Sequence, residues 1–457
     1  MNDTGRVVAI GCSGCGALAA LTLKRLAPAM DVTIIREQEE KGLLTRCATP
    51  YICCGHVMVD PSYKSDSIFT DLGIRLVNVK AVEINRGSKT VATADGNTYA
   101  YDKLVLATGA KPFVPPLPGT DLPGVFTLRT SGDAVEILHW LNSRRVSNAV
   151  LVGAGAIGIE EAYLLSNQGV RVTVVEMLDH VMPKVLDADM SRGVEGYMRQ
   201  KGVDLKLSRH VSRILGSESV EAVELDSDEQ IEAGMVIVSA GARPNLEMAD
   251  EAGLQRGKLG LKVNKYLQTS DPDIYAGGDL IQYEDHVTGK PTLGQLRPNA
   301  VIAGRTIARN ILGHEVEFPP FINAFSTKFF DKSIAGAGVT EATAREHDLD
   351  IVSARSESAS QHSMMRGRRP YVLKLIFRRD NQQIVGGQIV SDSECPARYI
   401  DALALAIRAR MSALDLSTFR AAGQPELSPD PGKEPIAIAA QNAWLGLHQE
   451  ASAVSAS

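Results

Sequence analysis

The residues best suited to bind a ligand are the glycines of the stretch 153–158, Gly-Ala-Gly-Ala-Ile-Gly. This stretch follows a predicted strand over 149–152 and opens a predicted helix over 159–167. In that context glycines let the backbone approach a pyrophosphate at a helix N-terminus. Glu176 ends the next predicted strand, where its carboxylate can accept hydrogen bonds from both ribose hydroxyls, and no Lys or Arg follows before Lys184 to bind a 2′-phosphate. The pattern predicts NAD(H) rather than NADP(H).

A second glycine-rich stretch, 11–16, stands 142 positions earlier and departs from this pattern. It follows a predicted strand over 7–10 and precedes a helix over 17–26. Ser13 replaces the middle glycine. Arg36 stands where the ribose-binding acid is expected, and Glu37 could take that role only if the strand has already ended, because strand side chains alternate. We therefore expect a second dinucleotide-binding unit with altered adenosine contacts.

These glycines and acids belong to two predicted strand–turn–helix–strand units, and a region with another pattern of secondary structure follows the two units. From residue 324 onward the pattern changes to predicted strands over 371–379 and 383–390, followed by an amphipathic helix over 397–411. The predicted fold class is α/β, with two Rossmann-like dinucleotide-binding domains and a C-terminal α+β domain.

Composition excludes several classes of protein. The 48 basic and 54 acidic side chains leave a net charge of −6, which argues against a nucleic-acid partner. The uncharged run 7–23 is short for a membrane span and is interrupted by three glycines, so we expect no membrane association and a cytoplasmic location. Six cysteines in 457 residues do not form a secreted disulfide framework, and the nine scattered histidines predict no metal site.

The two units, the Ala-Thr-Gly turn at 107–109 and the Gly-Gly-Asp at 277–279 occur in an order that resembles the two-dinucleotide flavoprotein disulfide reductases over essentially the whole chain. In that family the first unit binds FAD, the second binds NAD(P)H, and the third domain forms a dimer interface. The resemblance implies an FAD-binding domain in two parts, 1–115 and 246–320. It also implies an NAD(H)-binding domain over 116–245, a dimerisation domain over 321–449 and a flexible tail over 450–457.

The stretch from Cys47 to Gly55, Cys-Ala-Thr-Pro-Tyr-Ile-Cys-Cys-Gly, is similar to the Cys-Gly-Leu-Pro-Tyr-Tyr-Ile-Gly-Gly of the single-cysteine branch. That branch contains CoA-disulfide reductases, persulfide or polysulfide reductases, and NADH oxidases and peroxidases. Cys47 would then face the flavin as a thiolate of low pKa, although a free cysteine can also be a small buried apolar residue. Cys53 and Cys54 are either packing residues or resolving thiols.

The resemblance also assigns roles to single residues. Glu160 matches a position near the flavin N5 and the nicotinamide. Gln424 stands where related enzymes carry a histidine that reaches the cysteine from the other subunit, and it cannot take up a proton near pH 7. The catalytic residues implied are Cys47, Glu160 and Gln424. The cofactor-binding residues implied are Gly11, Ser13, Gly16, Arg36, Glu37, Arg46, Val79, Thr108, Gly109, Gly153, Gly155, Ile157, Gly158, Glu176, Gly241 and Asp279.

The function implied is an FAD-dependent oxidoreductase that passes electrons from NADH through Cys47 to a low-molecular-weight disulfide, persulfide or polysulfide. A CoA-linked substrate is consistent with basic residues at 24–25 and 366–369, although such runs are also typical of solvated surfaces. Two alternatives remain open: reduction of O₂ or peroxide, and a flavin-bearing carrier or binding subunit with a decayed thiol site. We expect a homodimer that buries the apolar face of the 397–411 helix, including Ile400, Leu403 and Ile407.

Overall fold

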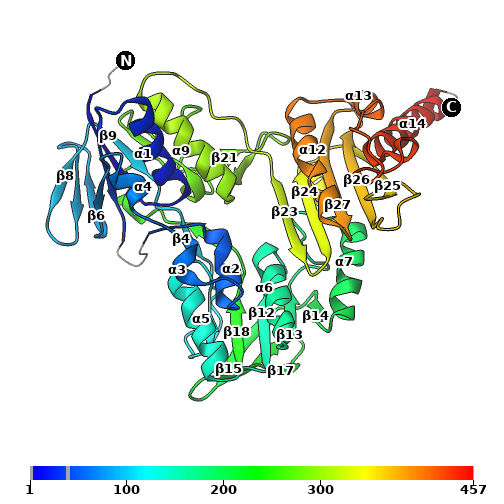
Figure 1. Ribbon diagram of the computed structural model, residues 1–457, viewed down its shortest axis with the longest axis horizontal. Coiled ribbons are helices and arrows are strands. Elements are labelled where there is room, and N and C mark those ends of the chain that lie inside the picture. The colour runs from blue at the N-terminus through cyan, green and yellow to red at the C-terminus, as the bar shows by residue number, and fades with distance from the viewer. Residues whose placement is uncertain (1–3, 38–41, 456–457) are drawn as a thin grey trace.

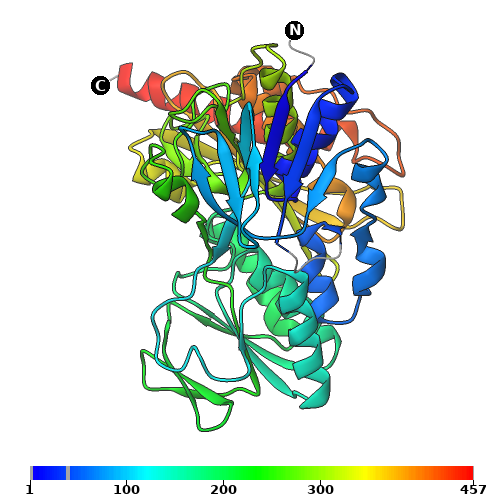
Figure 2. The ribbon, with the colours of Figure 1, turned by 90° about the vertical axis from the view of Figure 1, so that its left-hand side faces the viewer.

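The structure of the protein is a computed structural model, which describes residues 4–37 and 42–455. The first nucleotide unit lies at the centre of a five-stranded parallel sheet (Figures 1 and 2). Four of its strands are mostly buried apolar runs, as expected for a parallel sheet with both faces covered. In spatial order the five strands are β20 (Ile274–Ala276), β9 (Lys103–Leu106), β1 (Arg6–Ile10), β2 (Asp31–Ile35) and β5 (Arg75–Val77). Helices α1 (Gly14–Leu26) and α9 (Arg297–Ile311) pack against each other beside this sheet.

The second nucleotide unit forms another five-stranded parallel sheet, at the bottom of Figure 1. Its strands are, in spatial order, β11 (Val125–Phe126), β18 (Met235–Val238), β12 (Asn148–Val152), β13 (Arg171–Glu176) and β14 (Asp204–Leu207). The helices of this region are α5 (Ser131–Ser143), α6 (Ala156–Asn167) and α7 (Ala188–Gln200). The two parallel sheets confirm the predicted repeat.

Short elements connect and flank the two units. Strand β10 (Ala110–Pro112) pairs antiparallel with β19 (Ala242–Pro244), so the two crossings between the units run side by side. The redox stretch forms the 3₁₀ turn η1 (Arg46–Ala48) and helix α2 (Thr49–Cys53). The other short strands are β3 (Leu43–Leu44), β4 (Tyr63–Lys64), β6 (Ala81–Asn85), β7 (Thr90–Thr93), β8 (Thr98–Ala100), β15 (Val211–Gly216), β16 (Val220–Leu225), β17 (Gln230–Glu232), β21 (Gln282–Glu284) and β22 (Pro291–Leu293). The other short helices are α3 (Val59–Ser62), α4 (Ser67–Thr70), α8 (Glu247–Glu251) and η2 (Gly278–Leu280).

The C-terminal region is an antiparallel sheet with helices, which confirms the predicted fold class. Its strands are, in spatial order, β23 (Ala324–Phe329), β24 (Lys332–Gly338), β27 (Ile384–Ser391), β26 (Pro370–Arg378) and β25 (Ile351–Ala359). Its helices are α10 (Glu341–Glu346), α11 (Glu394–Ala397), α12 (Tyr399–Arg408), α13 (Ala413–Ser417), η3 (Pro431–Lys433) and α14 (Pro435–Ser455). Helix α14 extends into the segment 450–457 for which we expected a tail, and residues 456–457 lie outside the described residues.

The prediction that a dimer interface buries the apolar face of the 397–411 helix is wrong. The structure places its apolar residues Ile400, Leu403 and Ile407 at 3% exposure or less, packed on β24 and β27 of the same chain. Leu405, on the opposite face, is 66% exposed. An antiparallel sheet needs an apolar cover on its core face, and the helix that follows β27 supplies it. The regular apolar spacing therefore reports packing within the chain.

A buried lysine joins the second nucleotide unit to the C-terminal sheet. Lys374 on β26 has a side chain that is 4% exposed. Its Nζ lies 3.0 Å from Asp187 Oδ2, 2.9 Å from Asp189 Oδ1 and 2.8 Å from Glu341 Oε1. Asp187 and Asp189 stand at the start of α7, so the ion pairs connect that helix with the sheet.

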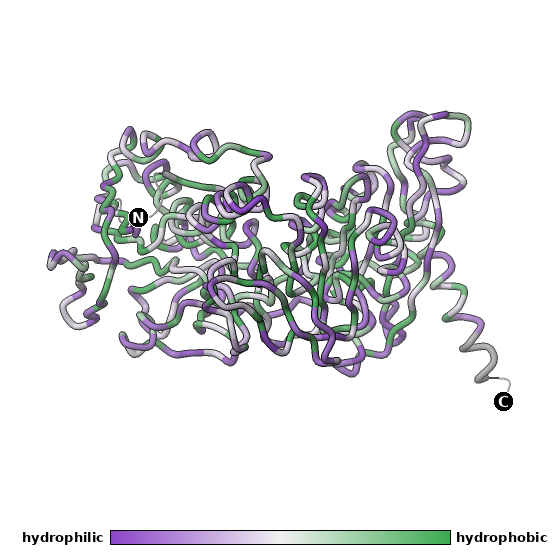
Figure 3. Tube along the Cα trace, turned by 90° about the horizontal axis from the view of Figure 1, so that it is seen from below, coloured by the Kyte–Doolittle hydropathy of each residue, from purple (hydrophilic) through white to green (hydrophobic). Residues whose placement is uncertain are grey.

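The tube in Figure 3 carries hydrophilic residues along many outer loops and hydrophobic stretches inside the molecule. Among the described helices, none has both the length and the apolar content needed to cross a membrane.

Candidate active site

The first glycine-rich loop packs closely between β1 and α1. Gly11 has a φ of +103°, and a Cβ on it would lie 2.3 Å from the Ala107 carbonyl oxygen. A Cβ on Gly16 would lie 2.0 Å from the Gly11 carbonyl oxygen. Both positions therefore require glycine, and the N-terminus of α1 is held next to the end of β1. Ser13 is the N-cap residue of α1, and its side chain makes no capping hydrogen bond.

Arg36 and Glu37 follow β2, and each has a partner within the chain. The buried Arg36 guanidinium binds Asp66 through Nη1 at 2.9 Å and Nη2 at 2.5 Å, and its Nε donates to Asn78 Oδ1 at 2.7 Å. The exposed Glu37 pairs with Lys80 at 3.1 Å. The bidentate pair fixes the plane of the Arg36 guanidinium at this end of the sheet. Contacts of Arg36, Glu37 or the nearby Val79 with adenosine remain a prediction.

A chain of hydrogen bonds leads from the Gly-Asp turn to the redox stretch. Arg129 Nη2 lies 2.7 Å from Asp279 Oδ2, and Arg46 Nη1 donates to the Arg129 carbonyl oxygen at 2.9 Å. The Thr108–Gly109 turn lies close by, because a Cβ on Gly109 would be 3.6 Å from Arg129 Nη2. Arg129 was not among the residues predicted from the sequence, because no local motif marks it.

The second glycine-rich loop joins β12 to α6 and leaves open space above its middle. A Cβ on Gly158 would lie 2.0 Å from the Gly153 carbonyl oxygen, which enforces close packing. Gly155, the N-cap of α6, and Gly241, with a φ of +109°, could each carry a Cβ that has nothing within 4 Å of it. Ile157 is 43% exposed beside them. The loop therefore presents a backbone surface that a ligand can approach.

Glu176 holds this loop in place. Its Oε2 accepts a hydrogen bond from the Ala154 N–H at 2.7 Å, and its Oε1 accepts one from the Leu178 N–H at 2.9 Å. A carboxylate has about four lone-pair sites, so acceptor capacity is left for ribose hydroxyls. The predicted ribose contact is thus compatible with the structure, and the carboxylate has a second role in shaping the loop.

Cys47 lies in η1, directly before α2, and its side chain is exposed. The surrounding protein still raises the pKa of its thiol, mainly through partial burial, while the positive charge of Arg297 lowers it and the carboxylates of Glu160 and Asp279 raise it. The expected low pKa is therefore not produced by the chain alone. Arg297 stands at the start of α9, far away in sequence, and was not predicted either.

Glu160 on α6 is held by the C-terminal region of the same chain. Thr327 on β23 donates from Oγ1 to Glu160 Oε1 at 2.7 Å. Burial raises the pKa of Glu160, and the hydrogen bond from Thr327 opposes that effect. The structure thus places Glu160 and Asp279 near enough to Cys47 for their charges to affect its pKa. Thr327, which binds Glu160, is a further site residue that no sequence motif indicates.

Gln424 is not brought to Cys47 within the chain. It occupies an exposed turn of the C-terminal region, where its Oε1 accepts a hydrogen bond from the Glu426 N–H at 2.7 Å. This turn is bonded to the β25–β26 loop, since the His362 N–H donates to the Pro425 carbonyl at 3.0 Å. Gln424 therefore lies on the surface of its own chain.

The remaining cysteines differ from Cys47 in their surroundings. Cys53 and Cys54 are at most 1% exposed, with their sulfur atoms 3.6 Å apart, and Cys53 Sγ donates to the Pro50 carbonyl at 3.0 Å. Cys15 is buried, which raises the pKa of its thiol to about 12, whereas Cys12 is half-buried. This burial favours a packing role for Cys53 and Cys54. The side chain of Cys395 lies outside the described residues.

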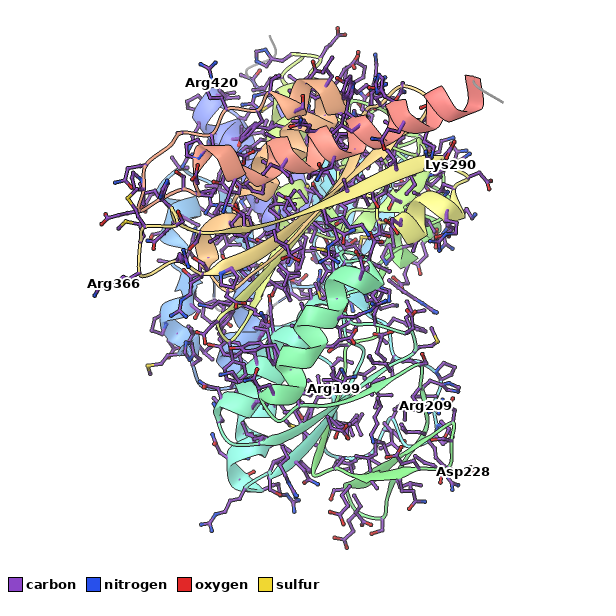
Figure 4. The ribbon with its side chains drawn as sticks, turned by 90° about the vertical axis from the view of Figure 1, so that its right-hand side faces the viewer. Arg199, Arg209, Asp228, Lys290, Arg366 and Arg420 are labelled. Atoms are coloured by element: carbon purple, nitrogen blue, oxygen red, sulfur yellow. The ribbon has the colours of Figure 1, made fainter. Side chains whose placement is uncertain are left out.

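The basic clusters that suggested CoA have local partners or face solvent. Lys24 Nζ donates to the carbonyls of Pro28 at 2.6 Å and Met30 at 2.9 Å. Arg368 Nη1 donates to the Ser363 carbonyl at 2.7 Å. Arg366 points outward at the edge of the molecule (Figure 4). These contacts fit solvated surfaces that also stabilise helix and loop ends.

The residues present fit two dinucleotides. Each glycine loop follows a central parallel strand and opens a helix whose first N–H groups have no partners within the helix. Gln295, two residues before α9, has a buried Nε2 without a hydrogen-bond partner among the described residues. This nitrogen can therefore donate a hydrogen bond to an acceptor atom of a ligand. No group of three or more His, Cys, Asp or Glu side chains in residues 4–37 and 42–455 is arranged to hold a metal ion.

Known proteins match the chain over nearly its full length. An NADH oxidase of Methanocaldococcus jannaschii is 36% identical, over 96% of this chain and 98% of its own. An NAD(P)H coenzyme A polysulfide/persulfide reductase of Pyrococcus horikoshii is 31% identical, over 93% and 95%. The structure of an NAD-dependent persulfide reductase from A. fulgidus superimposes with a TM-score of 0.92 at 34% identity, covering 96% of this chain and 83% of that one.

Two family models agree with these matches. The model of pyridine nucleotide-disulphide oxidoreductases matches residues 5–304, and the model of their dimerisation domain matches residues 324–430. Together they span both parallel sheets and most of the C-terminal sheet region. The chain therefore belongs to the pyridine nucleotide-disulphide oxidoreductase family.

Proposed function

We propose that this chain is an FAD-dependent oxidoreductase that passes electrons from NADH through Cys47 to a low-molecular-weight disulfide, persulfide or polysulfide. The observation that carries the proposal is the exposed Cys47 thiol, whose pKa is affected by the charges of Glu160 in the second unit and Asp279 in the first. The relatives named as persulfide and polysulfide reductases support this class of acceptor.

In this proposal each domain has a separate role. Residues 1–115 and 246–320 bind FAD, residues 116–245 bind NADH, and residues 321–449 form the subunit interface. Bound FAD would supply the two-electron relay between the nicotinamide and sulfur. Gly11 and Gly16 allow the close packing of the first phosphate-binding loop, and Arg129 holds Asp279 in an ion pair. Glu160 orients the reacting groups between the two units.

The chemistry of the chain itself takes place at the Cys47 sulfur. Its thiolate forms a bond to one sulfur of the substrate, and the substrate S–S bond breaks, so that its electron pair leaves on the other sulfur as a thiolate or, from a persulfide, as hydrosulfide. Two electrons that originate in NADH would then cleave the new S–S bond, which restores the Cys47 thiolate and releases the bound half of the substrate as a second thiolate. Arg297 favours the thiolate by its positive charge.

The dimerisation domain indicates a homodimer, and we propose that Gln424 of the second subunit approaches Cys47 across the interface. An amide side chain can donate and accept hydrogen bonds but cannot take up a proton near pH 7. A substrate whose leaving group has a low pKa, such as a persulfide, therefore suits this site better than an ordinary alkyl disulfide. Glu176 favours NADH over NADPH, since its carboxylate would repel a 2′-phosphate.

Substitution of the thiol tests the proposal. We expect Cys47→Ser to lose turnover of polysulfide and of low-molecular-weight disulfides, because a hydroxyl cannot form the mixed disulfide. Anaerobic reduction of bound FAD by NADH, followed by its absorbance in stopped flow, should stay intact. Cys54→Ala, which removes a buried thiol from the same stretch, is the matched control and should keep turnover. Disulfide reduction by Cys47→Ser at the wild-type rate would contradict the cysteine mechanism.

A second candidate is reduction of O₂ or peroxide, with Cys47 cycling through a sulfenic acid. The exposure of the thiol and the relative named as an NADH oxidase favour it. Oxygen uptake with NADH as the sole substrate separates the two functions, because a disulfide reductase gives only slow leakage. Rapid FAD reduction without turnover of disulfides, polysulfide, peroxide or O₂ would instead indicate that the chain is a flavin-bearing carrier or binding subunit without a working thiol site.

A further inference from the structure

Glu161 is a buried carboxylic acid that the proposed chemistry does not use. It follows Glu160 on α6, and its side chain is 0% exposed. Ser239 Oγ donates to its Oε2 at 3.1 Å. Its other oxygen, Oε1, is buried with no hydrogen-bond partner among the described residues. A buried polar atom without a hydrogen-bond partner lowers the stability of the folded protein, so the presence of an acid at this position requires an explanation.

The Ser239 contact connects Glu161 with the nucleotide loop. Ser239 directly follows β18 and precedes Gly241 by two residues. Its N–H donates to the Val152 carbonyl at 2.9 Å, and a Cβ on Gly153 would lie 2.7 Å from its carbonyl oxygen. Glu161 therefore links helix α6 to the 239–241 loop, which packs on the glycine-rich turn.

Helix α2 also packs on α6 at this place. Its residue Cys53 is fully buried, and its thiol is in electrostatic contact with Glu161. Helix α2 begins two residues after Cys47, so Glu161 of α6 lies between the helix that follows the redox thiol and the 239–241 loop. A change in the charge of Glu161 therefore affects its interactions with both helix α2 and the 239–241 loop.

The surroundings keep Glu161 neutral. The pKa of its carboxyl is raised to about 8, mainly by burial; the neighbouring charge of Glu160 also raises it, and the hydrogen bond from Ser239 opposes both. The titratable groups that face it are Glu160 on its own helix and Cys53 on α2. Both are acids, so neither favours the ionised form. An ionised Glu161 would have to move toward water, which would displace α6 or the 239–241 loop.

We infer that Glu161, in its neutral form, is a positioning residue for NADH: it holds α6 and the 239–241 loop in register, and its ionisation limits hydride donation at alkaline pH. This inference rests on the proposed binding of NADH to residues 116–245. Because Glu161 is fully buried, it acts on the NADH site only through the elements that it joins.

The test compares wild type with Glu161→Gln, because glutamine has the shape of the neutral acid and cannot ionise. The apparent second-order rate constant for anaerobic FAD reduction by NADH is measured by stopped flow between pH 6.5 and 9.5. For wild type we expect a fall of at least about fivefold between pH 7 and pH 9, as a group with a pKa near 8 loses its proton. For Glu161→Gln the fall should shrink to less than about twofold.

A matched control is Glu434→Gln. Glu434 is also buried, and its Oε1 also lacks a hydrogen-bond partner among the described residues, but it lies directly before α14, away from the nucleotide loops. This variant should keep the wild-type pH profile. The same alkaline fall in Glu161→Gln as in wild type would overturn the inference while leaving the proposed function intact. If NADH failed to reduce wild-type FAD at any pH, the proposed function itself would fail.

Discussion

Opposing charges surround the Cys47 thiol. Partial burial and two carboxylates, Glu160 and Asp279, raise its pKa, whereas the charge of Arg297 and a backbone hydrogen bond at Cys47 lower it. A thiol needs its thiolate form to attack sulfur, so Arg297 favours the reaction more directly than the residues that the local motif contains. The reactivity of this cysteine therefore depends on a residue 250 positions away in sequence.

Removal of the hydroxyl that holds Glu160 should shift its titration. In Thr327→Val the hydrogen bond that favours the ionised carboxylate is lost, and the pKa of Glu160, already raised by burial, should rise further. The acid limb of the pH profile for FAD reduction by NADH should then move to higher pH. Thr327→Ser keeps the hydroxyl and serves as the control. An unchanged acid limb in Thr327→Val would show that Glu160 does not govern this step.

Glu161→Gln should also change stability in a pH-dependent way. The pKa of Glu161 is about 8 in the folded protein and near 4.3 in the unfolded chain. Between these values only the unfolded chain has released the proton, so the wild type loses stability as pH rises, by up to about 1.4 kcal/mol per pH unit. The variant has no proton to release there. Thermal unfolding should show similar melting temperatures at pH 4.5 and a growing advantage of the variant toward pH 8. An advantage that is constant with pH would contradict this expectation.

At the scale of elements, the two glycine-rich turns combine close packing with open space. Gly158 and Gly16 each face a carbonyl oxygen at a distance that excludes a side chain, whereas Gly155 faces nothing within 4 Å. The first kind of glycine allows a helix to pack against its strand, and the second leaves room for a phosphate group. Identical residues in one motif therefore serve different physical purposes.

A pair of alanine substitutions separates these purposes. Gly158→Ala would place Cβ 2.0 Å from the Gly153 carbonyl oxygen, so we expect a lower melting temperature and loss of FAD reduction by NADH. Gly155→Ala fits the protein without contact, so its free energy of unfolding should stay within about 1 kcal/mol of the wild-type value. Its KM for NADH should nevertheless rise at least about tenfold, because the methyl group occupies the path of the pyrophosphate. A wild-type KM in Gly155→Ala would place the coenzyme elsewhere.

At the scale of the whole molecule, the C-terminal region contributes to the site within its own chain. Strand β23 supplies Thr327 to Glu160, and the Lys374 ion pairs fix the start of α7 on the same sheet. The apolar face of α12 covers that sheet and is not available to a partner. The dimerisation domain must therefore use another surface for association.

We expect a homodimer of about 98 kDa, twice the 49.0 kDa chain, at micromolar concentration. Light scattering coupled to size exclusion measures this mass. Exposed Leu427, at 69%, lies three residues after Gln424, and Leu427→Glu should weaken the dimer and lower turnover if that turn belongs to the interface. Leu405→Glu, on the exposed face of α12, is the matched control. A monomeric wild type with full turnover would contradict both the dimer and the approach of Gln424 to Cys47.

The fold class could be predicted from the sequence because both glycine motifs and their flanking strands are local patterns. A strand of apolar residues that ends in a glycine turn and a helix specifies a parallel unit without reference to distant residues. The family and its cofactors followed from the order of these patterns. The apolar spacing within 397–411 also correctly predicted a helix, observed as α12. Periodicity does not, however, distinguish a helix face that packs within the chain from one that packs between chains.

Only the tertiary structure decided the surroundings of the reactive groups. Arg297, Thr327, Arg129 and Ser239 come from separate elements, and no local motif places them beside Cys47, Glu160, Asp279 and Glu161. The pKa of a thiol or carboxyl depends on burial and on charges a few ångströms away, and these arise when distant segments pack together. The sequence by itself therefore determined which groups could react, and packing determined how strongly each group holds its proton.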